Sequence, residues 1–244
     1  MNAWGITDRG VVRQQNQDYF HLNVLHDSSL AVCSVCDGMG GARSGNVASV
    51  MAVDAFIEET ELLIKPGMNG RAMKTALLQA VSTANARIYE KGRSDPACYG
   101  MGTTMVCALV TPSVAVIANV GDSRAYIVDK NGIERVTRDH SVVEDLLAMG
   151  ELSREEAKTH PSKNLVTRAL GTDESVKPDV FTVELREGDY VLLCSDGLTN
   201  TVEDQEILYE VIHGGDPSKC CRRLMELANE RGGPDNITIV LISV

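Results

Sequence analysis

The sequence predicts an α+β sandwich, and three observations lead to this fold class. Short apolar runs that are typical of strands cluster near the start, the middle and the end of the chain. Turn sequences at residues 111–113 and 130–132 separate several of these runs, which indicates antiparallel hairpins. The helical stretches fall between the hairpins and do not alternate strictly with strands, as they would in a doubly wound parallel sheet.

Each predicted strand is a short apolar run that lies close to turn-forming residues. The predicted strands cover residues 30–36, 104–110, 114–119, 124–128, 190–194 and 237–244. Two long helices are predicted from apolar side chains spaced three and four residues apart, within residues 48–56 and 77–88. The second helix has a C-terminal cap signature at Lys91-Gly92. Shorter helices are predicted over residues 141–149, 154–160, 204–213 and 217–230.

Length, charge and cysteine content limit the classes of protein that the chain can belong to. Its 244 residues, 43% of them apolar, suit one domain over residues 1–244. A net charge of −11 argues against nucleic acid or an anionic membrane as the main partner, although ordinary solubility explains such acidity equally well. No apolar run is long enough to span a bilayer, and the seven cysteines include several inside strand-like runs, where a thiol packs as a small hydrophobe. We therefore expect a cytoplasmic protein.

Short segments that contain aspartate are the most informative feature of the chain, and most of them lie where a predicted strand ends. Several carboxylates held at strand ends can converge on one hard cation such as Mg²⁺ or Mn²⁺. Any one Asp-Gly pair after a strand is more often a tight turn with an Asx hydrogen bond. Together, however, they would concentrate negative charge if they met without a cation, although sequence spacing alone does not show that they meet. The segments are residues 16–18, 37–41, 121–124, 195–197 and 235–236.

An ordered set of short motifs resembles the metal-dependent protein phosphatases of the PPM (PP2C-type) family, specifically the compact bacterial serine/threonine phosphatases. The motifs run in order from about residue 5 to the end of the chain. They are Thr7-Asp8-Arg9-Gly10, Asn16-Gln17-Asp18, Asp37-Gly38-Met39-Gly40-Gly41, Gly100-Met101-Gly102-Thr103-Thr104, Asn119-Val120-Gly121-Asp122-Ser123-Arg124, Asp139-His140-Ser141, Ser195-Asp196-Gly197-Leu198 and Asp235-Asn236-Ile237-Thr238. The resemblance implies a four-layer αββα sandwich, in which two packed antiparallel sheets are flanked by helices.

The resemblance also implies a binuclear Mn²⁺/Mg²⁺ centre that activates a water for attack on phosphorus. Carried onto this chain, Asp37 would bridge both ions, and the carbonyl of Gly38 would bind one of them. Asp196 and Asp235 would bind the other ion, and Asp18 would act mainly through a water. Asp122 together with Asp196 would hold a third, more weakly bound metal ion, and Arg13 would bind the phosphate of the substrate. Asn236 would orient a ligand or water beside Asp235. The segment at about residues 144–165 would form a flap beside the site.

The chain departs from the family pattern at two positions, and three further residues are given structural roles. Gln17 stands where some relatives carry a glutamate that binds metal, so a water must replace that ligand here. Met39 stands where some relatives carry a histidine that protonates the leaving group, so the residue or water that donates this proton is not identified. Our hypothesis is that a water at the Asp122–Asp196 site donates the proton, which full turnover in Asp122→Ala would rule out. We expect a structural role for His140, packing or an ion pair for Arg124 rather than a phosphate contact, and a salt bridge to a nearby acid for Arg168 rather than a contact with substrate.

The resulting functional hypothesis is a cytoplasmic bacterial phosphatase that acts on phosphoserine and phosphothreonine in proteins and opposes a Ser/Thr kinase. Two alternatives stay open. One is a binding module for phosphoproteins that has kept the fold and lost turnover, against which the complete set Asp37, Asp196 and Asp235 argues. The other is a phosphatase dedicated to one regulatory partner, such as an anti-anti-sigma factor.

Overall fold

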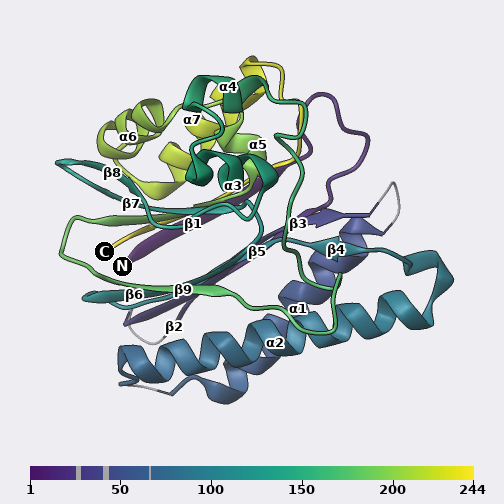
Figure 1. Cartoon of the computed structure of the whole chain (residues 1–244). Coiled ribbons are helices and arrows are strands. Elements are labelled where there is room, and N and C mark those ends of the chain that lie inside the picture. Colours follow the sequence, from purple (N-terminus) through teal and green to yellow (C-terminus); the bar gives the residue numbers. More distant parts are fainter. Residues whose placement is uncertain (26–28, 41–43, 66) are drawn as a thin grey trace.

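Two antiparallel sheets lie face to face in the computed structural model, which describes residues 1–25, 29–40, 44–65 and 67–244 (Figure 1). Among these residues, one sheet has the strand order β1 (Asn2–Asp8), β11 (Ile237–Ser243), β10 (Tyr190–Cys194), β7 (Arg124–Asp129) and β8 (Gly132–Arg135). The other has the order β2 (Asp18–Leu25), β3 (Leu30–Met39), β5 (Met105–Val110), β6 (Val114–Val120) and β9 (Asp179–Glu184), with the short β4 (Gly102–Thr103) paired to β3. The predicted α+β sandwich is confirmed.

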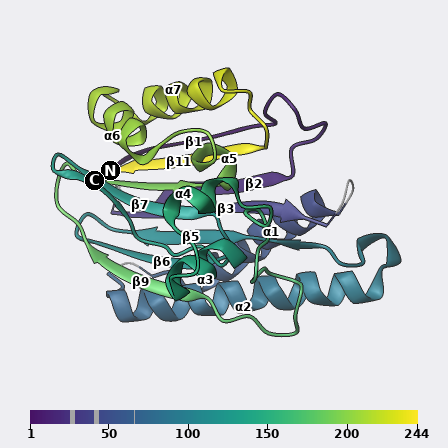
Figure 2. The same ribbon diagram turned by 45° about the horizontal axis from the view of Figure 1, so that its top comes forward.

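Helices cover the outer face of each sheet and complete four layers (Figure 2). The pair α1 (Gly45–Leu63) and α2 (Gly70–Ser94) packs on the sheet that contains β3. The pair α6 (Asp204–His213) and α7 (Pro217–Glu230) packs on the sheet that contains β11. A 3-10 turn (Pro96–Cys98) follows α2, and a short helix, α5 (Asp196–Thr199), follows β10. Within the described part of the chain, every helix is too short or too polar to cross a lipid bilayer.

The alternation of side chains along β3 explains how one strand serves two hydrophobic cores. Ala31, Cys33 and Val35 face the other sheet and pack in the core between the sheets, with residues of the neighbouring β5 and of β10 and β11 across the interface. Val32 and Cys36 point the opposite way, into the core beneath α1 and α2. Successive side chains of a strand point to opposite faces, so a buried strand between two layers is apolar throughout. The two cores hold the end of β3 in a fixed place.

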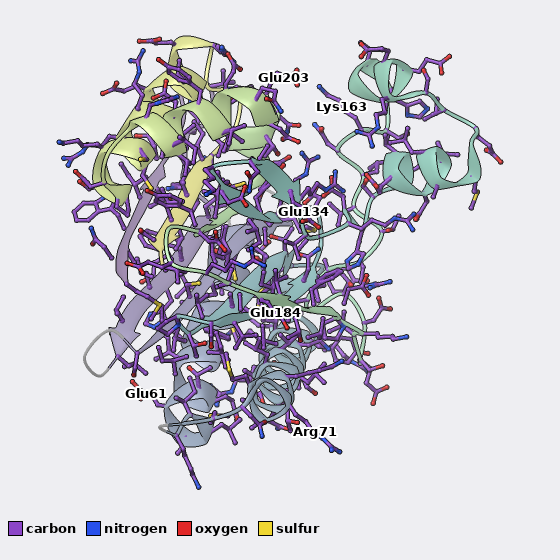
Figure 3. All side chains as sticks on the ribbon, turned by 90° about the vertical axis from the view of Figure 1, so that its left-hand side faces the viewer. Glu61, Arg71, Glu134, Lys163, Glu184 and Glu203 are labelled. Carbon is purple, nitrogen blue, oxygen red and sulfur yellow. The ribbon has the colours of Figure 1, made fainter. Side chains whose placement is uncertain are left out.

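A flap segment, defined here as residues 142–165, leaves the sandwich and returns to it. It contains α3 (Val142–Met149) and α4 (Arg154–Thr159), and Figure 3 shows these helices set to one side of the two sheets. A β-bridge between Ser141 and Val166 closes its base, and the amide of Val142 donates to the carbonyl of Leu165 at 3.0 Å. The segment agrees in position with the predicted flap, whose function stays a prediction.

Several predicted boundaries were wrong. Helix α2 continues past the expected cap at Lys91-Gly92 and ends at Ser94, followed by Asp95 with extended backbone. Asp37 lies inside β3 and not after it, and Asp196 begins the helix α5 instead of continuing a strand-end turn. The strands β1, β2, β4, β8 and β9 were not predicted.

Candidate metal centre

Antiparallel pairing of β2 with β3 places Asp18 directly opposite Asp37. Thr104 fixes the main chain of Asp37, because its hydroxyl accepts from the Asp37 amide at 2.9 Å and its amide donates to the Asp37 carbonyl at 2.8 Å. Directly opposed residues of an antiparallel pair have neighbouring side chains. Two carboxyl groups therefore start the site as immediate neighbours on a rigid sheet.

Asp18 is buried, and its two oxygens have different surroundings. Oδ2 accepts hydrogen bonds from the hydroxyls of Ser195 and Thr238, each at 2.7 Å. Oδ1 is buried and has no hydrogen-bond partner among the described residues. Burial raises the pKa of Asp18 to about 7, and the charges of Asp196 and Asp235 also raise it, while the two hydroxyls act in the opposite direction.

The turn from β10 into α5 supplies Asp196. Its Oδ2 accepts from the side chain of Asn200 at 2.9 Å, whereas its Oδ1 is buried without a hydrogen-bond partner in the described structure. Burial, followed by the charge of Asp235, raises its pKa to about 6, while the hydrogen bond from Asn200 acts in the opposite direction. Gly197 is required here, because a Cβ at this position would lie 2.0 Å from the carbonyl oxygen of Asn236.

Asp235 precedes β11 and meets the loop of residues 9–17, called here the arginine loop. Nη2 of Arg13 donates to Oδ2 of Asp235 at 2.7 Å, and half of the Arg13 side chain is exposed. Asn236 binds the main chain of this loop at three points: its Oδ1 accepts from the Gln17 amide at 2.8 Å, and its Nδ2 donates to the carbonyls of Arg9 and Gln15. The structure thus gives Asn236 a use that was not predicted, and its expected role toward a ligand or water stays a prediction.

Gly38 lies where β3 meets the start of α1 at close quarters. Its amide donates to the carbonyl of Gln17 at 3.1 Å, and a Cβ on Gly38 would lie 2.1 Å from the carbonyl oxygen of Gly45. Only glycine allows the two main chains to approach so closely. Gly41, the last residue of the Asp37-Gly38-Met39-Gly40-Gly41 motif, lies outside the described residues.

Asp122 follows Gly121 in the turn between β6 and β7 and is buried. Burial, followed by the charges of Asp196 and Asp139, raises its pKa to about 8. Gly121 has a φ of +107°. A Cβ there would lie 2.6 Å from the side chain of Thr104, the residue that also fixes Asp37. The turn that carries Asp122 is therefore packed against the support of the first carboxyl pair.

The five predicted carboxyl groups form one electrostatic cluster. Burial raises the pKa of Asp37 well above its ordinary value, and the charges of the other four aspartates, Asp18, Asp196, Asp122 and Asp235, all act in the same direction. Like charges that face one another destabilise the ionised state unless a cation or a proton compensates them. Arg13 alone does not neutralise such a group. The cluster requires added positive charge.

The donor set fits hard divalent cations. The five acidic side chains offer carboxylate oxygens, and Asp18 and Asp196 each leave a buried carboxylate oxygen without a partner in the described structure. Oxygen donors of this kind suit Mg²⁺ and Mn²⁺. Among the described residues, no three His, Cys, Asp or Glu side chains form a ready-made ligand group by themselves. Main-chain carbonyls and waters would therefore have to complete the coordination of each ion.

Hydroxyl-bearing residues are the functional contacts that sequence reasoning missed. Ser195, Thr238 and Thr104 hold Asp18 and Asp37, and each lies within or beside a motif that had been singled out only for its aspartate or glycine. The salt bridge predicted for Arg168 is confirmed by its contact with Asp179 at 3.2 Å, and of the two roles left open for Arg124 the structure shows the ion pair, with Asp139 at 2.7 Å.

Comparison with known proteins places this geometry in a family context. A family model described as "Protein phosphatase 2C" matches residues 6–237. The serine/threonine phosphatase stp of Listeria welshimeri is 41% identical over 246 residues, covering 99% of this chain and 95% of that protein. Stp1 from Staphylococcus aureus, a solved serine/threonine phosphatase, superposes with a TM-score of 0.91 at 37% identity, covering 99% of this chain and 94% of that chain. The catalytic domain of the serine threonine protein phosphatase PstP, solved in complex with two manganese ions, gives 0.85 at 32% identity, covering 98% and 96%.

Proposed function

The chain belongs to the protein phosphatase 2C family and is a protein serine/threonine phosphatase, and on this premise we propose how its site works. The proposed reaction is hydrolysis of phosphoserine and phosphothreonine in proteins by a water activated at a binuclear Mn²⁺ or Mg²⁺ centre. The observation that supports it best is the cluster of five carboxyl groups with two unpartnered, buried oxygens.

The proposed ligand assignment follows the placement of each group. The charges of all four other carboxyl groups of the cluster raise the pKa of Asp37, and this central position suits a ligand shared by two ions. The carbonyl of Gly38 would join it on one ion, and Asp196 with Asp235 would hold the other. Asp18 lies behind them, fixed by two hydroxyls, and would act mainly through a water. Asp122, on whose pKa Asp196 has the largest effect of the cluster charges, would complete a weaker third site.

Bound divalent ions would supply an activated water and screen the negative charge of the phosphate. The protein's own groups position the substrate. Arg13 presents a half-exposed guanidinium beside Asp235, and such a group donates two parallel N–H bonds to phosphate oxygens, which a lysine does less well. Asn236 holds the loop that carries Arg13 and so fixes the distance between this cation and the carboxyl cluster.

In other hydrolases a cysteine or serine side chain serves as the nucleophile. In this chain the surroundings of the cysteines and of Ser195 disfavour that role, which agrees with direct attack by water. All seven cysteines are buried, and burial raises the pKa of Cys33 and Cys194 to about 12. The hydroxyl of Ser195 is committed to Asp18. A thiolate or alkoxide at these positions would be strongly disfavoured.

A phosphothreonine peptide assay tests the proposal. Release of phosphate should require Mn²⁺ or Mg²⁺, stop with EDTA and be lost in Asp37→Ala. Asp54→Ala, which removes an exposed carboxylate of α1, is the matched control and should leave turnover unchanged. Equal hydrolysis by metal-stripped protein would contradict the binuclear mechanism. Tight binding of the phosphopeptide without any release of phosphate would instead support the alternative of a binding module.

The biological setting is also proposed. We expect the phosphatase to act in the cytoplasm and to oppose a Ser/Thr protein kinase. Quantitative comparison of phosphopeptides with and without the protein checks this. An increase at many phosphoserine and phosphothreonine sites supports a general role, whereas an increase at one site would favour a phosphatase dedicated to a single partner.

A further inference from the structure

His140 makes two main-chain contacts with the residue that precedes Asp122. The amide of His140 donates to the carbonyl of Gly121 at 2.9 Å, and the amide of Gly121 donates to Nδ1 of the His140 ring at 3.0 Å. His140 therefore holds both polar groups of one glycine, and its side chain is 7% exposed. A glycine with positive φ has many alternative conformations, so this pair of bonds restricts the turn that presents Asp122.

The opposite edge of the His140 ring is fixed by charged groups. Nε2 lies 3.2 Å from Oδ2 of Asp179 and 2.9 Å from Nη1 of Arg168. Because Nδ1 accepts from Gly121, the hydrogen of the neutral ring lies on Nε2 and is directed to Asp179. Nε2 is then a donor and cannot accept from the nearby Nη1 of Arg168, which donates instead to Asp179 and to the carbonyl of Lys177. Arg168 is held in turn by Asp179 and by the carbonyl of Lys177 at 2.9 Å. The carboxylate of Asp179 thus selects the tautomer that the Gly121 bond requires.

The main chain of His140 also belongs to the base of the flap segment. The amide of Thr167 donates to the carbonyl of His140 at 2.8 Å, next to the bridge between Ser141 and Val166. On the other side, Nδ2 of Asn119 donates to the carbonyls of both Gly121 and Arg138. His140 is therefore the residue where the Asp122 turn, the flap base and β9 meet.

We propose that His140 is a positioning residue: its Nδ1 fixes the Gly121 peptide, and through it the direction in which Asp122 enters the metal site. The importance of Asp122 as a ligand rests on the proposed function, whereas the bond from Gly121 to His140 does not. The ring makes no contact with the proposed tight ligands Asp37, Asp196 and Asp235. The proposed role of His140 therefore concerns the position of Asp122 alone, and it differs from a contribution to the stability of the whole fold.

Two substitutions separate the two ring nitrogens. In His140→Asn, the amide oxygen is as many bonds from Cα as Nδ1, so it can still accept from Gly121. In His140→Gln, the amide reaches the position of Nε2 and leaves the Gly121 amide without its acceptor. Asp179→Asn is a milder third variant at a partly exposed position, which removes the anion that fixes the tautomer.

The first readout is hydrogen exchange of the Gly121 amide in metal-free protein, followed by NMR. We expect exchange in His140→Gln to be faster by roughly tenfold or more, since a lost buried hydrogen bond has about this effect, with His140→Asn close to wild type and Asp179→Asn in between. Exchange in His140→Gln as slow as in the wild type would overturn the proposal, and so would equal acceleration in both His140 variants.

The second readout is Mn²⁺ titration by calorimetry, with thermal melting as a check on folding. The weakest Mn²⁺ should lose about tenfold in affinity in His140→Gln and little in His140→Asn, with the tighter ions unchanged in both. Equal weakening of all ions would mean a general structural role and would overturn the proposal. If His140→Gln does not fold, the asparagine variant decides: retained slow exchange and retained Mn²⁺ affinity support the role, and loss of both overturns it.

The exchange measurement also separates this proposal from the proposed function. It uses neither metal nor substrate, so its result stands if the phosphatase mechanism fails. A wild-type protein that binds only two ions would contradict the third site at Asp122. In that case the Gly121 exchange rate alone decides whether His140 holds the turn.

Discussion

The carboxyl cluster and the flap segment carry similar residues in opposite settings. In the cluster, two acidic side chains lie on paired strands and three lie in the turns at strand ends; they are partly or fully buried and act on one another's pKa. In the flap, Glu144 and Asp145 pair with arginines at the surface: Arg138 lies 3.2 Å from Asp145, and both side chains are half exposed. A charge in water interacts weakly, whereas a charge held in a partly dry cluster is costly until it is compensated. Rigid strands can therefore hold a metal site together, while a segment attached at one base is free to vary.

The largest expected effect is on turnover, and it should be confined to the cluster. Asp37→Asn should reduce hydrolysis of a phosphothreonine peptide by at least on the order of a hundredfold, because a group that organises transition-state charge is lost. Asp145→Asn, the matched change in the flap, should alter turnover on p-nitrophenyl phosphate by less than about twofold. Similar losses in steady-state rate for both variants would break the distinction between the two regions.

The second prediction compares two ion pairs that differ in burial. Arg124→Gln leaves Asp139, which is 8% exposed, without its closest cation and should lower the free energy of unfolding by about 3 kcal/mol. Arg138→Gln removes a half-exposed partner and should cost less than about 1 kcal/mol. Urea denaturation of the metal-free proteins measures both values. An equal loss in the free energy of unfolding for both variants would show that burial does not determine how much these two ion pairs contribute to stability.

Metal removal gives the third prediction. Ions that bind only the folded state should raise the free energy of unfolding by about 2.7 kcal/mol at a hundredfold excess over Kd. Thermal melting with Mn²⁺ and with EDTA checks this, and the shift should disappear in Asp37→Asn while persisting in Asp145→Asn. A shift of the same size in both variants would place the stabilising ion outside the cluster.

The smallest effect concerns the hydroxyls beneath the cluster. Thr238→Val removes a donor to Oδ2 of Asp18 and the 2.7 Å contact with the hydroxyl of Thr7, and it should cost about 1–2 kcal/mol in the free energy of unfolding. Thr182→Val on the exposed face of β9 is the matched control and should stay within about 0.5 kcal/mol of wild type. A neutral Thr238→Val would mean that these hydroxyls do not support Asp18.

Local sequence signals predicted the parts of the fold whose apolar pattern is strong. The ranges 190–194, 204–213 and 217–230 match β10, α6 and α7 residue for residue. The strands β1, β2 and β9 were missed because their side chains are mostly only partly buried and alternate less clearly, and all three lie at sheet edges. The helix α5 is too short for a periodic signal.

The candidate site was predicted from residue types and family resemblance, and its assembly was not predictable from spacing. Asp18 and Thr238 are separated by 220 positions in sequence and yet share a hydrogen bond. The hydroxyl contacts with the aspartates and the hydrogen bonds from Asn236 to the arginine loop form only when distant segments meet in the folded chain. They therefore cannot be predicted from a local sequence pattern. The ion pairs of Arg124 and Arg168 agree with the structural roles expected for these residues, and Arg124, the more buried of the two, is paired with a buried carboxylate.

The position of β11 between β1 and β10 has a consequence for synthesis. The first strand made has no neighbour in its sheet until the last one leaves the ribosome, and Asp235 and Asn236 reach the arginine loop only at that moment. A nascent chain therefore lacks a complete cluster until β11 has been made. The site becomes complete in one late step of synthesis, and a chain that is truncated before β11 cannot form it.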